Sequence, residues 1–343
     1  MPTANIADQC DYQGTACSVS RGGPGRHGSR FLQHARIHVG ADAFIGPRQR
    51  RWFRVDEGID PYADGLGEMT EEGGCKDSAA INAKGMIVNM HPIFDTHAHY
   101  DHGKFDADRD VLLASLPEKG VGLVVNIGAD LTGSDASVRL ADRYDTIYAT
   151  VGIHPHDATT LDDRALAALA RHCDHPKVVA IGEIGLDYHY DYSPREVQQQ
   201  AFRRQLELAA ELKKPVVIHS READADTYAL LEYYRPPGIV HCFSGSAEMA
   251  ATYVKLGFYI GFTGVVTFKN ARRPLEAAAA VPLDRLLLET DCPYMAPEPY
   301  RGRRCDSTML PGVAQALAKV KKVDVDALVK QCWDNGKAVY GIA

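Results

Sequence analysis

The 343-residue sequence lacks several features that would place it in a special class of protein. It contains no uninterrupted apolar run near the roughly 20 residues that a transmembrane helix needs, which excludes an integral membrane protein and predicts no membrane partner. It also lacks a basic excess, because 38 Lys and Arg stand against 45 Asp and Glu, for a formal net charge of −7. A nucleic-acid substrate would therefore need a local basic patch or metal ions to hold it.

Paired cysteine motifs are missing as well. The eight cysteines are scattered along the chain, without a CxxC pair and without a secretory signal. They are Cys10, Cys17, Cys75, Cys173, Cys242, Cys292, Cys305 and Cys332. In a chain of this length the pattern predicts free thiols in a reducing compartment, and we expect a cytoplasmic protein.

The first 90 residues have little hydrophobic periodicity. They hold 13 of the 30 glycines, and no apolar segment of the signal-peptide type is present. Asp8 and Asp11 argue against a transit peptide, which is poor in acidic residues. We expect residues 1–90 to be a largely disordered N-terminal extension. A second interpretation is that the start is assigned too far upstream, since Met86 and Met90 directly precede the first strong strand.

Residues 91–343 alternate between short β-branched runs and longer segments with helical period. The expected strands are Ile93–Thr96, Gly122–Ile127, Ile147–Val151, Val178–Ile181, Pro215–Ile218, Gly238–Val240, Phe258–Ile260 and Leu286–Leu288. Helical segments separate them, which favours a parallel sheet. Eight such units in about 250 residues fit an α/β domain with the (β/α)8 TIM-barrel architecture of the metal-dependent hydrolases. An open doubly wound sheet is the alternative, but the glycine-rich phosphate loop that it predicts after the first strand is missing.

Histidine is abundant, with 14 residues, and several histidines lie where the expected strands end. In a barrel the carboxyl ends of the strands converge on one rim. Five strand ends bring four imidazoles and two carboxylates to it: His97, His99, Glu183, His219, His241 and Asp291. Divalent cations prefer such ligands, and burying all six groups without a metal would leave unpaired polar atoms. The sequence therefore predicts a metal site.

The spacing of these residues suggests two ions. His97 and His99 are two residues apart on a strand, so both can bind one ion. His219 and His241 can bind a second ion, and the two oxygens of Glu183 can bridge the pair. Asp291 can bind a metal and accept a proton from the attacking water. We expect two divalent ions per chain, with Zn, Mn, Mg, Co and Ni as candidates.

Two further groups of residues have two interpretations each. Arg221 and Arg303, which has arginine neighbours, could contact backbone phosphates through their bidentate guanidinium groups, or could lie on solvated loops. Tyr188 and Tyr190 follow the fourth strand and could stack on a base or pack against the barrel mouth.

Taken together, these motifs resemble those of the TatD family of metal-dependent deoxyribonucleases. The matching segments are Phe94-Asp95-Thr96-His97-Ala98-His99, Gly152-Ile153-His154-Pro155-His156, Ile181-Gly182-Glu183-Ile184-Gly185-Leu186-Asp187-Tyr188, Val217-Ile218-His219-Ser220-Arg221, Val240-His241-Cys242-Phe243-Ser244-Gly245 and Leu288-Glu289-Thr290-Asp291-Cys292-Pro293-Tyr294. The resemblance covers about residues 93–343. It implies a TIM barrel with a two-metal site that cleaves phosphodiester bonds, with the six residues above as ligands and His154 as a contact to the substrate phosphate.

Two segments depart from that family. After the last strand the family usually has Arg-Asn-Glu-Pro, whereas this chain has Arg303-Arg304-Cys305-Asp306-Ser307. Near the C-terminus the family more often has an Asn-aromatic stretch ending in Phe-Gly, whereas this chain has Cys332-Trp333-Asp334-Asn335-Gly336-Lys337-Ala338-Val339-Tyr340-Gly341. Neither departure includes a predicted metal ligand, but both could change substrate recognition or the seating of the last helix.

We predict a two-metal phosphodiester hydrolase, a TatD-type deoxyribonuclease and exonuclease, with DNA or a small phosphodiester as substrate. Asp291 and Glu183 are the predicted catalytic residues, and His154, Arg221 and Arg303 the predicted substrate contacts. An amidohydrolase-type enzyme acting on a cyclic amide, lactone or phosphotriester is the first alternative. Such enzymes commonly place a carbamylated lysine where this chain has Glu183. A catalytically silent binding barrel is the second alternative, and no oligomeric state follows from the sequence.

Overall fold

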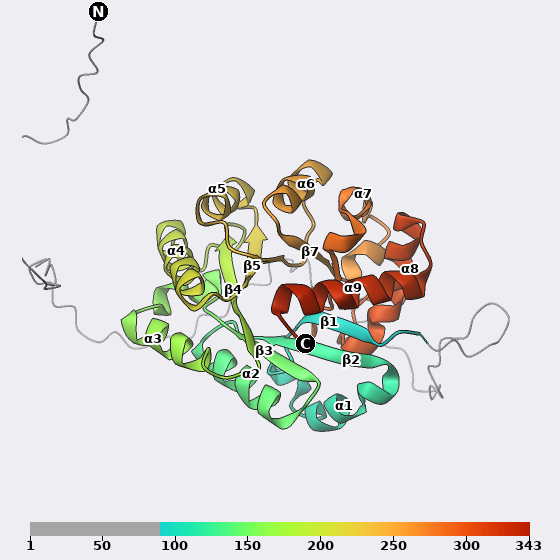
Figure 1. The fold of residues 1–343 in the computed structure, drawn as a ribbon, viewed down its shortest axis with the longest axis horizontal. Helices are drawn as coiled ribbons and strands as arrows, with labels where there is room; N and C mark the ends of the chain where they lie inside the picture. The colour runs from blue at the N-terminus through green and yellow to red at the C-terminus, as the bar shows by residue number, and fades with distance from the viewer. Residues whose placement is uncertain (1–89) are drawn as a thin grey trace, which may run out of the picture. The chain divides into compact units, whose positions relative to one another are not determined.

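The computed structural model describes residues 90–343, so the predictions for the N-terminal extension lie outside the described residues. Eight parallel strands form one sheet in chain order, and helices surround it (Figure 1). The strands are β1 Ile93–Ala98, β2 Val121–Ile127, β3 Ile147–Val151, β4 Val178–Asp187, β5 Val216–Arg221, β6 Gly238–Val240, β7 Tyr259–Phe262 and β8 Leu286–Leu288. The predicted (β/α)8 barrel is confirmed.

The barrel closes where β8 meets β1. The Thr96 hydroxyl donates a hydrogen bond of 3.0 Å to the carbonyl oxygen of Leu288. Beyond the end of β8, Ala98 forms a parallel bridge with Cys292. The Asp291 amide donates to the carbonyl oxygen of His97 at 2.9 Å. The closure therefore brings the segment after β8 beside the end of β1, where several of the predicted ligands lie.

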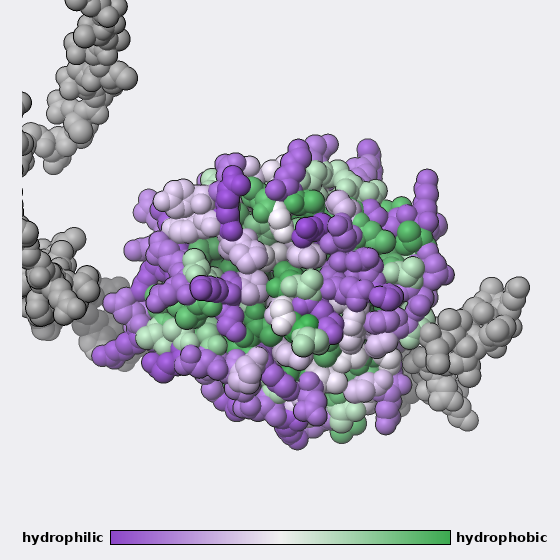
Figure 2. All heavy atoms as spheres, in the orientation of Figure 1, coloured by the Kyte–Doolittle hydropathy of each residue, from purple (hydrophilic) through white to green (hydrophobic). Residues whose placement is uncertain are grey.

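Nine α-helices accompany the strands in the described part of the chain. They are α1 Arg109–Ser115, α2 Leu131–Arg143, α3 Asp163–His172, α4 Arg195–Leu212, α5 Asp224–Tyr234, α6 Ala247–Lys255, α7 Arg272–Ala280, α8 Leu310–Lys321 and α9 Val325–Tyr340. None of these helices is long and apolar enough to cross a membrane. On the face shown in Figure 2, hydrophilic residues dominate the periphery and hydrophobic residues form smaller groups between them.

Helix α9 packs against the end of the barrel at which the strands begin. Buried side chains near the strand starts, including Phe94, Val179 and Val217, form one apolar cluster with Val339 and Tyr340 of α9. The Tyr340 hydroxyl also donates to the carbonyl oxygen of Thr96 at 2.8 Å. The apolar packing at this end stabilises the barrel, and the carboxyl ends of the strands remain available for a functional site.

Strand β4 is longer than its hydrophobic run predicts. It continues through Glu183 to Asp187, and it pairs there with β5, with Gly185 opposite His219 and Asp187 opposite Arg221. Gly185 has a φ of +148°, and a Cβ atom there would lie 1.9 Å from the carbonyl oxygen of His219. Glycine is therefore required for the two strands to approach closely beside the predicted ligands.

Candidate metal centre

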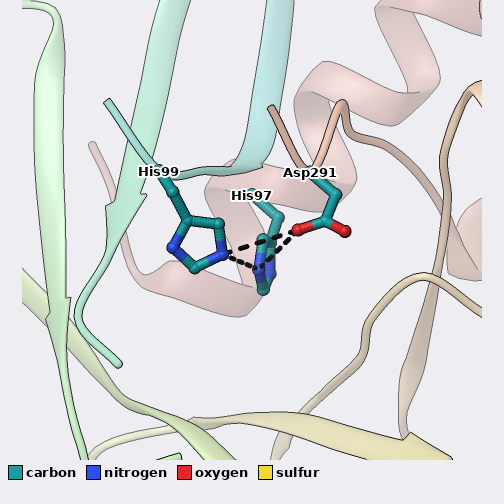
Figure 3. A group of neighbouring side chains, drawn as sticks. All are labelled: His97, His99 and Asp291. Carbon is teal, nitrogen blue, oxygen red and sulfur yellow. Dashed lines mark hydrogen bonds and ion pairs between the residues drawn. The ribbon is translucent and has the colours of Figure 1, made fainter. Parts of the chain in front are cut away.

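Four donor atoms from three parts of the barrel converge at its carboxyl rim. His97 and His99 come from β1 and the residue after it, Asp291 follows β8, and Glu183 lies within β4. The two imidazoles and the Asp291 carboxylate face one another (Figure 3). We call His97 Nε2, His99 Nε2, Asp291 Oδ1 and Glu183 Oε2 the first donor group.

The spacing within the first donor group matches that of a small divalent cation. His97 Nε2 lies 3.2 Å from His99 Nε2, 3.6 Å from Glu183 Oε2 and 3.7 Å from Asp291 Oδ1. His99 Nε2 lies 3.7 Å from Glu183 Oε2 and 3.5 Å from Asp291 Oδ1. In a tetrahedral zinc site with bonds of about 2.0–2.2 Å, neighbouring ligand atoms are about 3.3–3.6 Å apart. The donor set thus fits a divalent metal in both chemistry and spacing.

The other oxygen of Glu183 faces a second set of imidazoles. Glu183 Oε1 lies 2.9 Å from His219 Nδ1, 2.7 Å from His241 Nε2 and 3.7 Å from His154 Nε2. We call these four atoms the second donor group. Each oxygen of this single carboxylate therefore contacts a different group of imidazoles, which is the arrangement that a bridging ligand requires.

Hydrogen bonds define which nitrogen of each ring carries a lone pair. His99 Nδ1 lies 3.2 Å from the carbonyl oxygen of Ile127, an acceptor, so this nitrogen carries a proton, and Nε2 is the atom that would bind a metal after losing its own proton. In His154 the pattern is reversed, because the His156 amide donates to Nδ1 at 3.2 Å. A neutral His154 therefore carries its proton on Nε2. His99 is arranged as a metal ligand and His154 as a hydrogen-bond donor.

The electrostatics of the centre favour a bound cation. Burial opposes a charge on Glu183, but the surrounding imidazoles, His241 and His154 first among them, hold its pKa well below the usual range. Burial also opposes a charge on His99, yet its contacts with Asp291 and the charge of Glu183 raise the pKa of His99 to about 9. Burial and the neighbouring His241 lower the pKa of His97 to about 4. Two ionised carboxylates thus hold negative charge among largely buried rings.

Asp187 is a contributor that the sequence analysis missed. Its side chain is almost fully buried, and its Oδ2 lies 3.0 Å from His219 Nε2 and 3.0 Å from His156 Nε2. The contact orients His219 so that its other nitrogen, Nδ1, faces Glu183. Carboxylates commonly hold metal-binding histidines in this way. His156 also lies behind the metal ligands, because it contacts the same oxygen of Asp187.

Glu289 is a second residue without a predicted role. Its carboxylate is fully buried beneath the imidazoles, and Oε1 accepts a hydrogen bond from the amide of Cys242. Oε2 has no hydrogen-bond partner among the described residues, and neither has Nδ1 of His97 or of His241, although His241 Nδ1 lies 3.9 Å from Glu289 Oε1. Burial raises the pKa of Glu289 to about 8. A Cβ atom at Gly261 would lie 2.2 Å from Glu289 Oε2, so glycine is needed to make room for this acid.

Asp95 fixes the backbone that carries the first donor group. This fully buried carboxylate accepts hydrogen bonds from the Thr290 amide and hydroxyl at 3.0 and 2.7 Å and from the Ser307 hydroxyl at 2.6 Å. It therefore ties β1 to the segment before Asp291 and to the first of the two segments that depart from the TatD pattern. Asp291 itself has a φ of +58°, a left-handed conformation that Asp and Asn tolerate better than most residues.

The predicted substrate residues lie in different surroundings. His154 joins the second donor group. The Arg221 guanidinium lies at the end of β5, 4.7 Å from the centre of the Tyr190 ring. Arg303 is exposed in the loop between β8 and α8, where its neighbour Arg304 instead pairs with both oxygens of Asp108 at 2.6 and 2.7 Å. The structure thus places His154 at the centre, Arg221 beside a tyrosine, and Arg303 outside the two donor groups.

Comparison with known proteins identifies similar chains. A family profile described as TatD related DNase matches residues 94–341. The "uncharacterized metal-dependent hydrolase YabD" of Bacillus subtilis (strain 168) is 39% identical over 253 residues, which are 73% of this chain and 99% of the relative. The "3'-5' ssDNA/RNA exonuclease TatD" of Cronobacter sakazakii is 38% identical and covers 68% of this chain and 91% of its own length. The crystal structure of the TatD homologue YJJV from Escherichia coli K12 aligns with a TM-score of 0.70 and 31% identity, covering 73% of this chain and 98% of that one.

Proposed function

The chain belongs to the family of TatD-related DNases, and from this membership and the geometry of the rim we propose that it is a two-metal phosphodiesterase that removes nucleotides from DNA ends. Family membership makes it a metal-dependent hydrolase of ester bonds. Its relative in Cronobacter sakazakii is named for exonuclease activity on single-stranded DNA and RNA, which supports a nucleic-acid substrate here.

A single observation carries the two-metal part of the proposal: the two oxygens of Glu183 face two different groups of imidazoles. In this proposal the first donor group, with His97, His99, Asp291 and Glu183, holds one ion. Glu183, His219 and His241 hold the second. When bound, such ions polarise the phosphodiester and make a water acidic enough to supply hydroxide near neutral pH. Zn, Mn, Mg, Co and Ni remain the candidate metals.

The chain's own residues supply proton transfer and positioning. Burial favours the neutral acid at Asp291, but His99, His97 and His241 lower the pKa of this carboxylate, so it is ionised at neutral pH. It is therefore ready to take the proton of the attacking water. The Nε2–H of His154 points toward Glu183, where it can donate to a phosphate oxygen. Arg221 at the end of β5 and Arg303 in the loop between β8 and α8 complete the proposed phosphate contacts.

The described cysteines support a reducing location. Five thiols within the described residues are free: Cys173, Cys242, Cys292, Cys305 and Cys332. Free thiols of this number are typical of proteins that work in the cytoplasm, and we propose this location. Fractionation of cells that express the protein at its natural level would test it.

A digestion panel tests the proposed activity. Single- and double-stranded DNA and RNA of defined sequence are incubated with the metal-stripped protein and each candidate metal in turn, with product lengths resolved at single-nucleotide level. We expect stepwise shortening of DNA that a chelator abolishes and added metal restores. Cleavage that persists in excess chelator would contradict a metal mechanism. Hydrolysis of a cyclic amide, lactone or phosphotriester without any cleavage of nucleic acid would support the amidohydrolase alternative instead.

A further inference from the structure

Two tyrosines project from the loop that links β4 to α4, beside the candidate metal centre. The rings of Tyr190 and Tyr192 are stacked, with centroids 5.2 Å apart and planes 18° from parallel. Tyr192 is 68% exposed, although its ring is large and mostly apolar. We call this pair the tyrosine platform. Its position after Glu183 and Asp187 places it at the rim to which the donor groups belong.

The turn that presents the platform is held in one conformation. Asp191, between the two tyrosines, has a φ of +49°, and its carboxylate accepts hydrogen bonds of 2.7 to 3.1 Å from Arg195. The Tyr190 amide donates to Asp187 Oδ1 at 2.9 Å. The Arg221 guanidinium lies over the Tyr190 ring. These contacts order Tyr190 and the turn, so an exposed ring at Tyr192 is presented in a prearranged position.

The platform is connected to the candidate metal centre by direct contacts. The His156 ring meets Tyr192 edge-on, with centroids 4.8 Å apart, and meets His154 at 4.3 Å. His154 in turn lies 3.7 Å from Glu183 in the second donor group. Asp187 makes a second connection, because one of its oxygens contacts His219 while the other accepts from the Tyr190 amide. Only two ring contacts therefore separate Tyr192 from His154, the proposed hydrogen-bond donor to the substrate phosphate.

We propose that the tyrosine platform binds an unpaired nucleobase of the substrate next to the scissile phosphate, with the base stacked on Tyr192. This inference rests on the proposed function and names its recognition element. Every nucleobase has a flat π-face, so an aromatic ring binds it with little sequence preference. A base inside a duplex already has neighbours on both faces, so the platform favours single-stranded ends. The positive charge of Arg221 lies beside it, where a flanking backbone phosphate would be attracted.

The experiment combines a change in the protein with a change in the substrate. KM and kcat are measured for wild type and Tyr192→Ala on short single-stranded DNA, and on the same DNA with one abasic residue at each of the three terminal positions of either end in turn. Loss of one stacked base is expected to raise KM about 10-fold with kcat changed less than about twofold. Tyr192→Trp, which keeps an aromatic ring, should have a KM close to that of wild type. Tyr233→Ala is the matched control, because Tyr233 is 81% exposed at the end of α5 that leads into the start of β6.

The two changes must not be additive. We expect the abasic residue at one position to raise KM for wild type and to have no further effect on Tyr192→Ala, because both changes remove the same contact. An unchanged KM in Tyr192→Ala, or an equal loss on every abasic substrate, would overturn the platform while the nuclease activity stands. A wild-type protein that hydrolyses bis(p-nitrophenyl) phosphate but no oligonucleotide would instead overturn the nuclease proposal, and the platform with it.

Discussion

The two ends of the barrel are built from opposite kinds of residue. At the end where the strands begin, Phe94 packs against Trp333 and Tyr340 of α9, and Gly336 lets the helix approach because a Cβ atom there would lie 2.6 Å from the Phe94 ring. At the carboxyl rim, imidazoles and carboxylates are buried together, and some of their polar atoms have no hydrogen-bond partner among the described residues. One end is organised to be stable, and the other buries polar groups at an energetic cost that hydrogen bonds within the described residues only partly offset.

The comparison teaches that burial alone does not identify a core. His97 and Glu289 are as deeply buried as Phe94, yet burial stabilises Phe94 and works against the charged forms of the other two. A change at the rim should therefore reduce activity more than stability, and a change at the opposite end should do the reverse. Three variants test this division, taken in order of decreasing effect.

The largest expected effect is at Asp291. In Asp291→Asn the amide can still coordinate weakly but cannot accept the proton, so kcat should fall by about 10²–10⁴-fold. Asn tolerates the left-handed backbone at this position, so the melting temperature should stay close to that of wild type. Metal content by mass spectrometry should remain largely intact. Asp106→Asn, which alters an exposed carboxylate paired with Arg109, is the control, and wild-type turnover by Asp291→Asn would exclude Asp291 as the base.

The opposite end should respond in stability. Phe94→Ala removes a fully buried ring from the cluster with Tyr340 and should lower the free energy of unfolding by about 3–5 kcal/mol. Turnover per folded molecule at low temperature should be unchanged, because the carboxyl rim is preserved. Denaturant titration gives the stability, and Phe94→Leu should lose less because it leaves a smaller cavity. A large loss of turnover by folded Phe94→Ala would show that the two ends are not independent.

The smallest of the three effects is expected at Asp187, which contacts the predicted metal ligand His219 from behind. Asp187→Asn weakens the carboxylate that orients His219, and metal affinity should fall by about 10–100-fold without loss of the fold. Calorimetric titration of the metal-stripped protein measures this affinity. Asp163→Asn, at an exposed pair with Arg204, serves as the matched control. Equal metal affinities for Asp187→Asn and wild type would show that the Asp187 carboxylate is not required to orient His219 for metal binding.

Hydrophobic runs predicted the barrel well because strand starts are apolar, and they failed where polar residues are buried. The run at Val178–Ile181 ends before Gly182 and Glu183, but β4 continues to Asp187 because imidazoles replace water around its carboxylates. Helix α9 contains Gly336, a weak helix former whose presence is explained by the ring of Phe94, far away in the sequence.

The site could be predicted where residues act through spacing along one strand. His97 and His99 share a strand and gave a local signal, and the other four predicted ligands lie on the same rim. No local sequence signal identified Asp187, Glu289 or Asp95. A single acidic residue forms no pattern along the chain, and its role depends on the neighbours that the fold supplies. Tyr192 was overlooked for the same reason, although Tyr190 was named.

The contact between Tyr340 and Thr96 has a consequence for how the protein matures. Thr96 lies directly before His97, so a residue near the end of the described chain anchors the strand that begins the active rim. Until α9 has been synthesised, β1 lacks this hydrogen bond and the apolar end of the barrel is open to water. We therefore expect hydrolytic competence to arise only after α9 is complete, and chains that terminate before α9 to be degraded rather than to accumulate as partly active enzyme.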